Sequence, residues 1–149
     1  MEYDLEELKE LYLRAVADYK NLKNRVAKER LDMANQIRNE ILKKFIPVYD
    51  DIYKACMFKS KDKGLDFILK KFNSIFKEFN VETIPNLNGK TFNSDIAEAV
   101  STQVTHVSIT LDNMIADTVS SGLRDIETNE IILYPKVIVY KFVEMGTDA

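Results

Sequence analysis

Apolar residues recur every three or four positions along the first part of the chain, the spacing that places them on one side of an α-helix. The residues that carry this period are Leu5, Leu8, Tyr12, Ala15, Tyr19, Leu22 and Val26. Steps of three and four alternate, which is typical of a left-handed coiled coil. Beyond Val26 the heptad would place Glu29 and Gln36 in the seam, and an eleven-residue spacing fits better, which favours a straighter pair. The pattern predicts one helix over residues 5 to about 45, about 60 Å long.

A stripe on so long a helix needs a partner helix of equal length, because a chain of 149 residues has too little left to cover it. The simplest partner is a second copy of the chain. We therefore expect a parallel homodimer with Leu22 and Val26 in the seam between the helices. On this pattern alone, a passive spacer or scaffold is an equally good interpretation.

Pro47 predicts an end or a kink of the long helix and the start of a short one. A second short helix is expected between an N-cap at Asp62 and a left-handed residue at Asn80. Its apolar stripe comprises Leu65, Ile68, Leu69, Phe72, Ile75, Phe76 and Phe79. Two amphipathic helices form half of a four-helix bundle, which a second chain would complete. The expected dimer contacts on this helix are Leu65, Leu69, Phe72 and Phe76.

After Asn80 the sequence becomes rich in β-branched residues and turn formers. Expected strands cover residues 81–84, 100–104, 114–119 and 131–141, with Pro135 marking an edge or a bulge in the last. The predicted fold is α+β. Its parts are a coiled-coil helix over residues 1–45, a dimerisation bundle over 46–80 and a small, mostly β domain over 81–149.

The charge balance and the composition exclude several classes of protein. A net charge of −3, from 21 basic and 24 acidic residues, argues against a general nucleic-acid binder. A hydrophobic content of 46% supports a real core. One cysteine fits a reducing compartment, and the chain shows neither a signal peptide nor an apolar run long enough for a bilayer. These features predict a soluble cytoplasmic protein that binds no membrane.

Residues capable of catalysis are few and scattered. His106 is the single histidine, in a polar stretch that suits a surface, and Cys56 lies on an apolar helix face. Asp50 and Asp51 are neighbours that point to different sides of a helix, so they do not form an acid–base pair. The chain has no glycine-rich phosphate loop and no zinc-ligand spacing. We expect no enzyme activity and no cofactor.

Residues 12–25, YLRAVADYKNLKNR, closely resemble the long helix of GrpE proteins, the nucleotide exchange factors of DnaK-type chaperones. Residues 45–55, 64–82, 92–100 and 129–139 resemble further GrpE motifs in the same order, so the resemblance covers nearly the whole chain. The chain departs from the family pattern at Asn24, Asn80, Ala97, Glu130 and Leu133. Ala97 replaces a histidine of the pattern, and Glu130 and Leu133 replace two arginines.

The resemblance implies a homodimer that grips the nucleotide-binding domain of a DnaK-type chaperone. Binding favours an open nucleotide cleft, so that ADP leaves, and ATP then dissociates the complex. It also implies a thermosensor, because the interrupted seam should melt early. The competing hypothesis is a dimeric coiled-coil adaptor without exchange activity. A nucleic-acid-binding helix comes third, because residues 20–30 are basic, and an enzyme comes fourth.

Two sets of residues are expected to contact the chaperone. Asn21, Arg25 and Lys28 share one side of the long helix, off the main stripe. Val137 and Val139 share one face of the last strand, and alternation alone does not say whether that face meets the core or a partner. The resemblance places Val139 at a contact position, so both valines are assigned to the partner side. The alternative is that Val139 is a core residue.

Overall fold

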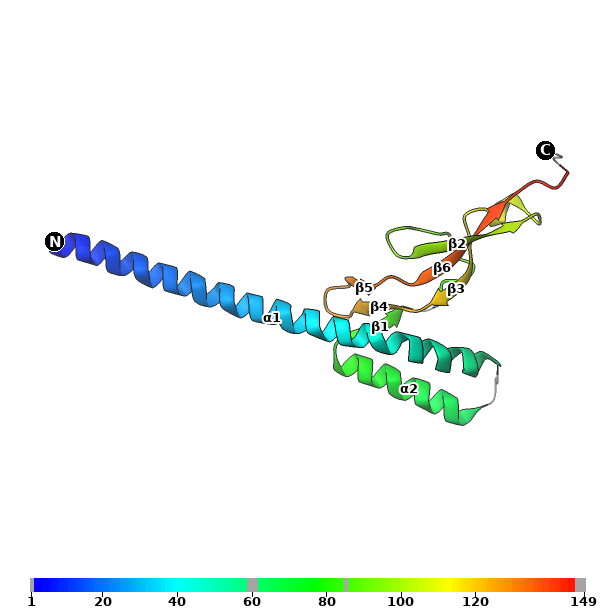
Figure 1. Cartoon of the computed structure of the whole chain (residues 1–149), viewed down its shortest axis with the longest axis horizontal. Coiled ribbons are helices and arrows are strands. Elements are labelled where there is room, and N and C mark those ends of the chain that lie inside the picture. Colours follow the sequence, from blue (N-terminus) through cyan, green and yellow to red (C-terminus); the bar gives the residue numbers. More distant parts are fainter. Residues whose placement is uncertain (1, 59–61, 85, 147–149) are drawn as a thin grey trace. The chain divides into compact units, whose positions relative to one another are not determined.

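The computed structural model describes residues 2–58, 62–84 and 86–146 (Figure 1). Two helices precede six strands, and a 3₁₀ helix, η1 (Ile109–Leu111), lies among the strands. The helices are α1 (Leu5–Phe58) and α2 (Lys63–Glu78). The strands are β1 (Val81–Ile84), β2 (Glu98–Thr105), β3 (Ile115–Ser120), β4 (Gly122–Asp125), β5 (Ile131–Leu133) and β6 (Lys136–Phe142). The α+β class is confirmed.

The chain divides into two compact units, Met1–Glu40 and Ile41–Ala149. The first unit is the N-terminal part of α1. Its start is capped by Asp4, whose carboxylate accepts a hydrogen bond from the Glu7 amide (2.9 Å), while the Glu7 carboxylate accepts one from the Asp4 amide (3.3 Å). This reciprocal pair satisfies two backbone donors that a helix start leaves without helical partners. The second unit contains the rest of α1, α2 and all strands.

The expected end of the long helix at Pro47 is wrong, because α1 continues through this residue to Phe58. Proline removes one backbone donor from the ladder, and the turns on either side keep theirs. The side chains next to Pro47 are also anchored: Ile46 is 1% exposed and Tyr49 is 6% exposed, both in the core. The first of the two expected short helices is therefore the C-terminal segment of α1.

The caps of α2 match the sequence prediction. The Asp62 carboxylate accepts hydrogen bonds from the amides of Gly64 (3.0 Å) and Leu65 (3.3 Å), which fixes the first turn. Asn80 has a φ of 58°, the left-handed conformation that ends a helix. β1 begins at the next residue, so the chain passes from helix to strand without a linker.

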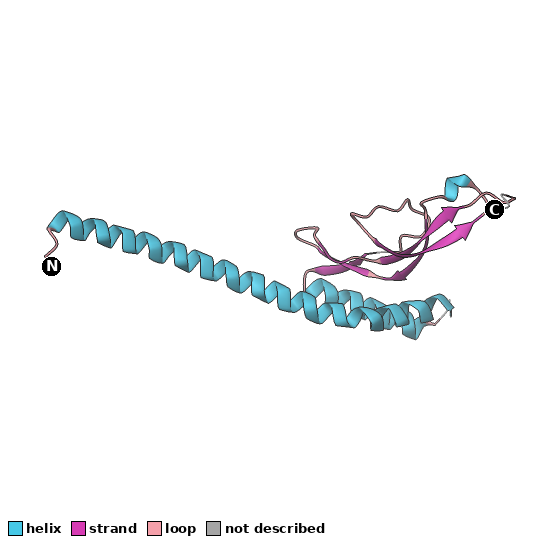
Figure 2. Ribbon diagram, turned by 45° about the horizontal axis from the view of Figure 1, so that its top comes forward, coloured by secondary structure: helices cyan, strands magenta, loops and turns pink. Residues whose placement is uncertain are grey.

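The strands form one antiparallel sheet and one mixed sheet, each of three strands. Figure 2 shows the strands in magenta. The proximal sheet has the order β1-β4-β5 and the distal sheet the order β2-β6-β3. In the distal sheet, β6 pairs with β2 in parallel and with β3 in antiparallel orientation. Residues 131–141, expected to be one strand, are two, because Pro135 lies where β5 ends and β6 begins and cannot donate to either ladder. β4 was not predicted from the sequence.

The chain crosses between the sheets at a narrow waist around Gly122. A Cβ atom at this glycine would lie 2.6 Å from the Leu133 carbonyl oxygen, 2.6 Å from the Pro135 ring and 2.7 Å from Ile84. Only glycine fits where a backbone carbonyl and two side chains approach so closely. The waist separates two cores, whose buried members are Leu42, Ile46, Tyr49, Phe76, Val81 and Leu123 on the helix side, and Ile84, Leu87, Ala97, Ile115, Val137 and Val139 on the other.

Candidate partner-binding surfaces

The polar face predicted on the long helix is accessible. Asn21, Arg25 and Lys28 are all exposed, at spacings of four and three that place them on one side of α1. The Arg25 guanidinium lies 3.7 Å from the Glu29 carboxylate, with both side chains about two-thirds exposed at 69% and 66%. An exposed pair of this kind contributes little to stability, so Arg25 can exchange it for another acidic partner at small cost.

The apolar seam of the same helix is also exposed in the single chain. Leu22 is 46% exposed and Val26 is half-buried. Tyr12 and Tyr19 are 68% and 64% exposed. Large apolar side chains this exposed and this regular mark a surface that another helix can cover. The assignment of Leu22 and Val26 to a dimer stays a prediction.

The apolar stripe of α2 divides into two parts with different environments. Phe76 is 2% exposed and belongs to the core of its own chain, with Leu69 and Phe72 packed against that core. The Phe76 ring lies 5.9 Å from that of Tyr49 and 6.1 Å from that of Phe72. The expected role of Phe76 as a dimer contact is therefore corrected: α1 and the proximal sheet already cover it. Leu65 is half-buried.

The flank of this stripe is open. Ile68, Ile75 and Phe79 are 42%, 45% and 49% exposed. In the neighbouring segment of α1, Ile41, Phe45 and Val48 are exposed in the same way, at 51%, 47% and 48%. These six residues are called the helical flank below. They are the better candidates for a dimer surface, and the sequence stripe did not separate them from the core residues beside them.

The two valines of β6 face the core, which corrects their assignment to the partner side. Val137 is 0% and Val139 6% exposed, and both contribute to the core of the distal sheet. Side chains alternate along a strand, so Ile138 and Tyr140 lie on the opposite face, where both are half-buried. β2 extends this face through Ser101 and Gln103, which pair with Ile138 and Tyr140. This set of four residues is called the outer face below.

A buried carboxylate that the sequence argument dismissed joins helix to sheet. Asp50 is 8% exposed, which is rare for an acidic side chain. Its carboxylate accepts hydrogen bonds from the Ser120 hydroxyl (3.0 Å) and from the Ser121 amide (3.1 and 3.3 Å to its two oxygens). The signal was present in the sequence, since Asp50 falls one turn after Ile46 and thus within the buried stripe of α1.

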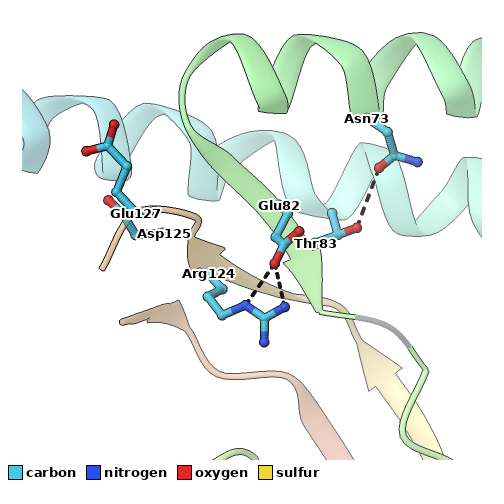
Figure 3. A network of polar contacts seen from close by, with 6 residues as sticks. All are labelled: Asn73, Glu82, Thr83, Arg124, Asp125 and Glu127. Atoms are coloured by element: carbon cyan, nitrogen blue, oxygen red, sulfur yellow. Dashed lines mark hydrogen bonds and ion pairs between the residues drawn. The ribbon is translucent and has the colours of Figure 1, made fainter. Parts of the chain in front are cut away.

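A second polar contact set lies between α2 and the proximal sheet (Figure 3). Arg124 on β4 pairs with Glu82 on β1 at directly opposed positions; its Nε donates to Glu82 Oε1 at 2.9 Å, and Nη2 donates to the same oxygen. Thr83 lies 3.5 Å from the Asn73 side chain and 3.4 Å from the Tyr49 hydroxyl. The ion pair thus joins β4 to β1, and the Thr83 contacts join β1 to both helices.

The residues considered for catalysis lie apart from one another. His106 is exposed and its Nδ1 lies 2.6 Å from the Val143 carbonyl oxygen, while Cys56 is half-buried on α1. Within residues 2–58, 62–84 and 86–146, no three acidic, histidine or cysteine side chains could jointly hold a metal ion. None of the helices in this described part combines the length and apolar character needed to cross a membrane.

Comparison with known proteins connects this chain to one family. The family model described as GrpE matches residues 1–140. The chain is 32% identical over 101 residues to Protein GrpE of Clostridium tetani, an alignment that covers 65% of this chain and 50% of that protein. It is 31% identical over 110 residues to Protein GrpE of Chlamydia trachomatis serovar L2, covering 68% of this chain and 57% of the relative. The chain spans about half the length of the curated relatives it matches. On the strength of the match to residues 1–140, the chain belongs to the GrpE family.

Proposed function

We propose that this protein is a co-chaperone that accelerates ADP release from a DnaK-type chaperone in the cytoplasm. The observation that carries the proposal is the match of the GrpE family model to residues 1–140, which include the long helix and nearly all of the β region. The proposed activity, faster ADP release, is inferred from the resemblance of the sequence to GrpE proteins. The factor needs no catalytic group and no cofactor for this role.

The physical basis of such exchange is differential binding. A protein that binds the open form of a nucleotide cleft more tightly than the closed form shifts the population towards the open form, from which ADP dissociates. The size of the shift is limited by the difference between the two affinities. Rigid, preformed surfaces suit this task, because little binding free energy is lost in ordering them.

Two surfaces are proposed to contact the nucleotide-binding domain of the chaperone. One is the polar side of α1 with Asn21, Arg25 and Lys28, whose cations can attract acidic groups on the partner. The other is the outer face of the distal sheet, which replaces Val137 and Val139 in this role. The outer face combines two partly exposed larger side chains, Ile138 and Tyr140, with the polar Ser101 and Gln103. Such a mixture of apolar and polar groups is common at protein interfaces.

The protein is proposed to act as a homodimer. The helical flank exposes six large apolar residues on α1 and α2, and the seam of α1 exposes more. A second copy of the chain is the occupant that fits both, because a parallel pair of identical helices brings identical stripes together. Leu22 and Val26 keep their proposed place in this seam, and Leu65, Leu69 and Phe72 lie next to the flank.

The long helix is also proposed to act as a thermosensor. Glu29 and Gln36 interrupt the heptad, and residues 2–34 of the described chain bury no side chain fully. A paired region held by so interrupted a seam should separate at a lower temperature than the aromatic core of the second unit.

The test is the release of a fluorescent ADP analogue from a DnaK-type chaperone, followed after mixing with excess ATP, with and without this protein. The expected result is a release rate that rises with the concentration of the protein and then saturates. The competing function is a dimeric coiled-coil adaptor, which the exposed helical stripe alone would equally serve. Binding to the chaperone without faster release would favour the adaptor and reject the exchange factor.

A further inference from the structure

The proximal sheet packs directly on the helices of the second unit, whereas the distal sheet contributes its buried residues to a different core. The helix-side core contains residues of α1, α2, β1 and β4, with β5 residues packed against it. The other core joins the two sheets: its described members come from β1 (Ile84), the segment between β1 and β2, β3 and β6, and Ile131 of β5 packs against it. Apolar packing therefore joins the proximal sheet directly to the helices, whereas the distal sheet packs on the proximal sheet and meets the helices through the contacts beside the waist.

A cavity of about 360 Å³ lies between the last turns of α1 and the strand β3. Tyr53, Met57 and Phe58 line it from the helix, and Asp117, Thr118 and Val119 line it from the strand. Side chains that face each other across such a space have lost the dispersion contacts of a close-packed interior, so they do little to set the distance between helix and strand.

Asp50 bridges helix and strand at the edge of this cavity. Its carboxylate accepts hydrogen bonds from the hydroxyl of Ser120, the last residue of β3, and from the amide of Ser121, the single residue between β3 and β4. It thus binds the point at which the chain passes from the distal to the proximal sheet, next to the glycine-only position 122. Hydrogen bonds to a carboxylate that is only 8% exposed are directional and little weakened by competing water.

We propose that Asp50 is a positioning residue that sets the angle of the distal sheet against the helices and so presents the outer face for partner binding. This inference rests on the proposed function. Without the carboxylate, the distal sheet can turn about the waist into the space of the cavity. Only part of the molecules then present the outer face correctly, and the apparent affinity for the partner falls by that fraction.

The first measurement is the distance distribution between spin labels within one chain. Cysteines replace Lys77 on α2 and Gln103 on β2, both exposed, in a Cys56→Ser background, and labelled protein is diluted with unlabelled protein. A narrow distribution of the distance between the two labels is expected with Asp50 in place, and a broad one for Asp50→Ala. Asp51→Ala is the matched control, because Asp51 is the exposed neighbour on the same helix, and it should leave the distribution narrow.

Two milder variants keep the test decisive if Asp50→Ala does not fold. Ser120→Ala removes the hydroxyl donor and keeps the Ser121 amide, so it should broaden the distribution partially. Asp50→Asn retains an oxygen that accepts from the Ser121 amide and should restore most of the narrow distribution. Equal widths for Ser120→Ala, Asp50→Ala and Asp51→Ala would overturn the proposal.

The second measurement is ADP release from the chaperone as a function of the concentration of the exchange factor. If the competent orientation falls to about a tenth of the population in Asp50→Ala, half-maximal acceleration needs about tenfold more protein, while the rate at saturation stays native. An unchanged half-maximal concentration would refute the positioning role even if the distances broaden. If the unmodified protein does not accelerate release, the proposed function fails, and the distance distributions alone decide whether Asp50 fixes the sheet.

Discussion

The ring of Tyr49 on α1 lies 5.9 Å from the ring of Phe76 on α2, at an angle of 52°. Both side chains are more than nine-tenths buried, and Val81 and Leu123 of the proximal sheet complete the same core. One chain thus covers the central part of its own helical stripe with aromatic packing. What remains for a second chain is the flank of that stripe.

Phe76→Ala should destabilise the single chain strongly. Removal of a buried phenylalanine leaves a cavity and lowers the free energy of unfolding by about 3–5 kcal/mol. Phe67→Ala is the matched control on the same helix, because Phe67 is 64% exposed, with the Lys71 ammonium 5.7 Å from the centroid of its ring. The free energy of unfolding of the control should fall by about 1 kcal/mol or less. Urea unfolding at constant protein concentration measures both, and equal losses would contradict the placement of Phe76 in the core.

The double variant Ile68→Asp, Ile75→Asp should dissociate the dimer and leave the helices folded. Both residues lie on the helical flank, where a carboxylate is hydrated in the free chain but would lose water in a dimer. Lys77→Asp should remain dimeric, because Lys77 is exposed and lies about 160–180° around α2 from both isoleucines. Light scattering at micromolar concentration gives the mass of each. A monomeric unmodified protein would reject the homodimer itself.

Charge reversal at Arg25 and Lys28 should weaken the complex with the chaperone, and more so at low salt, where exposed charges are least screened. Lys23→Glu is the control, because its position five residues before Lys28 places it on the opposite side of α1. The affinity is measured by titration at two salt concentrations. A salt-independent loss, or an equal loss for the control, would argue against this polar face.

Val139→Asp and Ile138→Asp should have opposite consequences, although the residues are neighbours. Val139 is 6% exposed in the core of the distal sheet, so an unpaired carboxylate there should unfold the sheet in the free protein. Ile138 lies on the outer face, so the same change should leave the melting of the protein intact and slow ADP release. Thermal melting and ADP release measured on both variants check the assignment. A folded Val139→Asp protein with slow release would restore Val139 as a contact residue.

Heating should separate the long helices before the second unit unfolds. The helix signal at 222 nm would then fall in two steps, whereas tyrosine and phenylalanine signals from the packed core around Tyr49 and Phe76 would change only in the later one. ADP release should slow across the first step and recover on cooling. One coincident transition by all probes would remove the basis for a thermosensor.

Local rules predicted much of this protein from its sequence. The helical period, the Asp62 cap, the left-handed Asn80 and the alternation in β6 depend on neighbours a few residues away, so the sequence expresses them directly. Motif order, which is also a property of the sequence, was sufficient to indicate the family that comparison then confirmed.

Tertiary contacts decided the rest. The sequence alone could not show that the helix passes through Pro47, because the packing of Ile46 and Tyr49 compensates for the lost donor. Alternation put Val137 and Val139 on one face of β6, but only the packing of that face into the core with Ile84 and Leu87 shows that it is buried. The apolar stripe of α2 likewise does not reveal which of its residues are buried within their own chain and which stay exposed. Asp50 shows the reason most clearly: its partners Ser120 and Ser121 lie 70 and 71 positions away, and a local pattern carries no record of contacts at that separation.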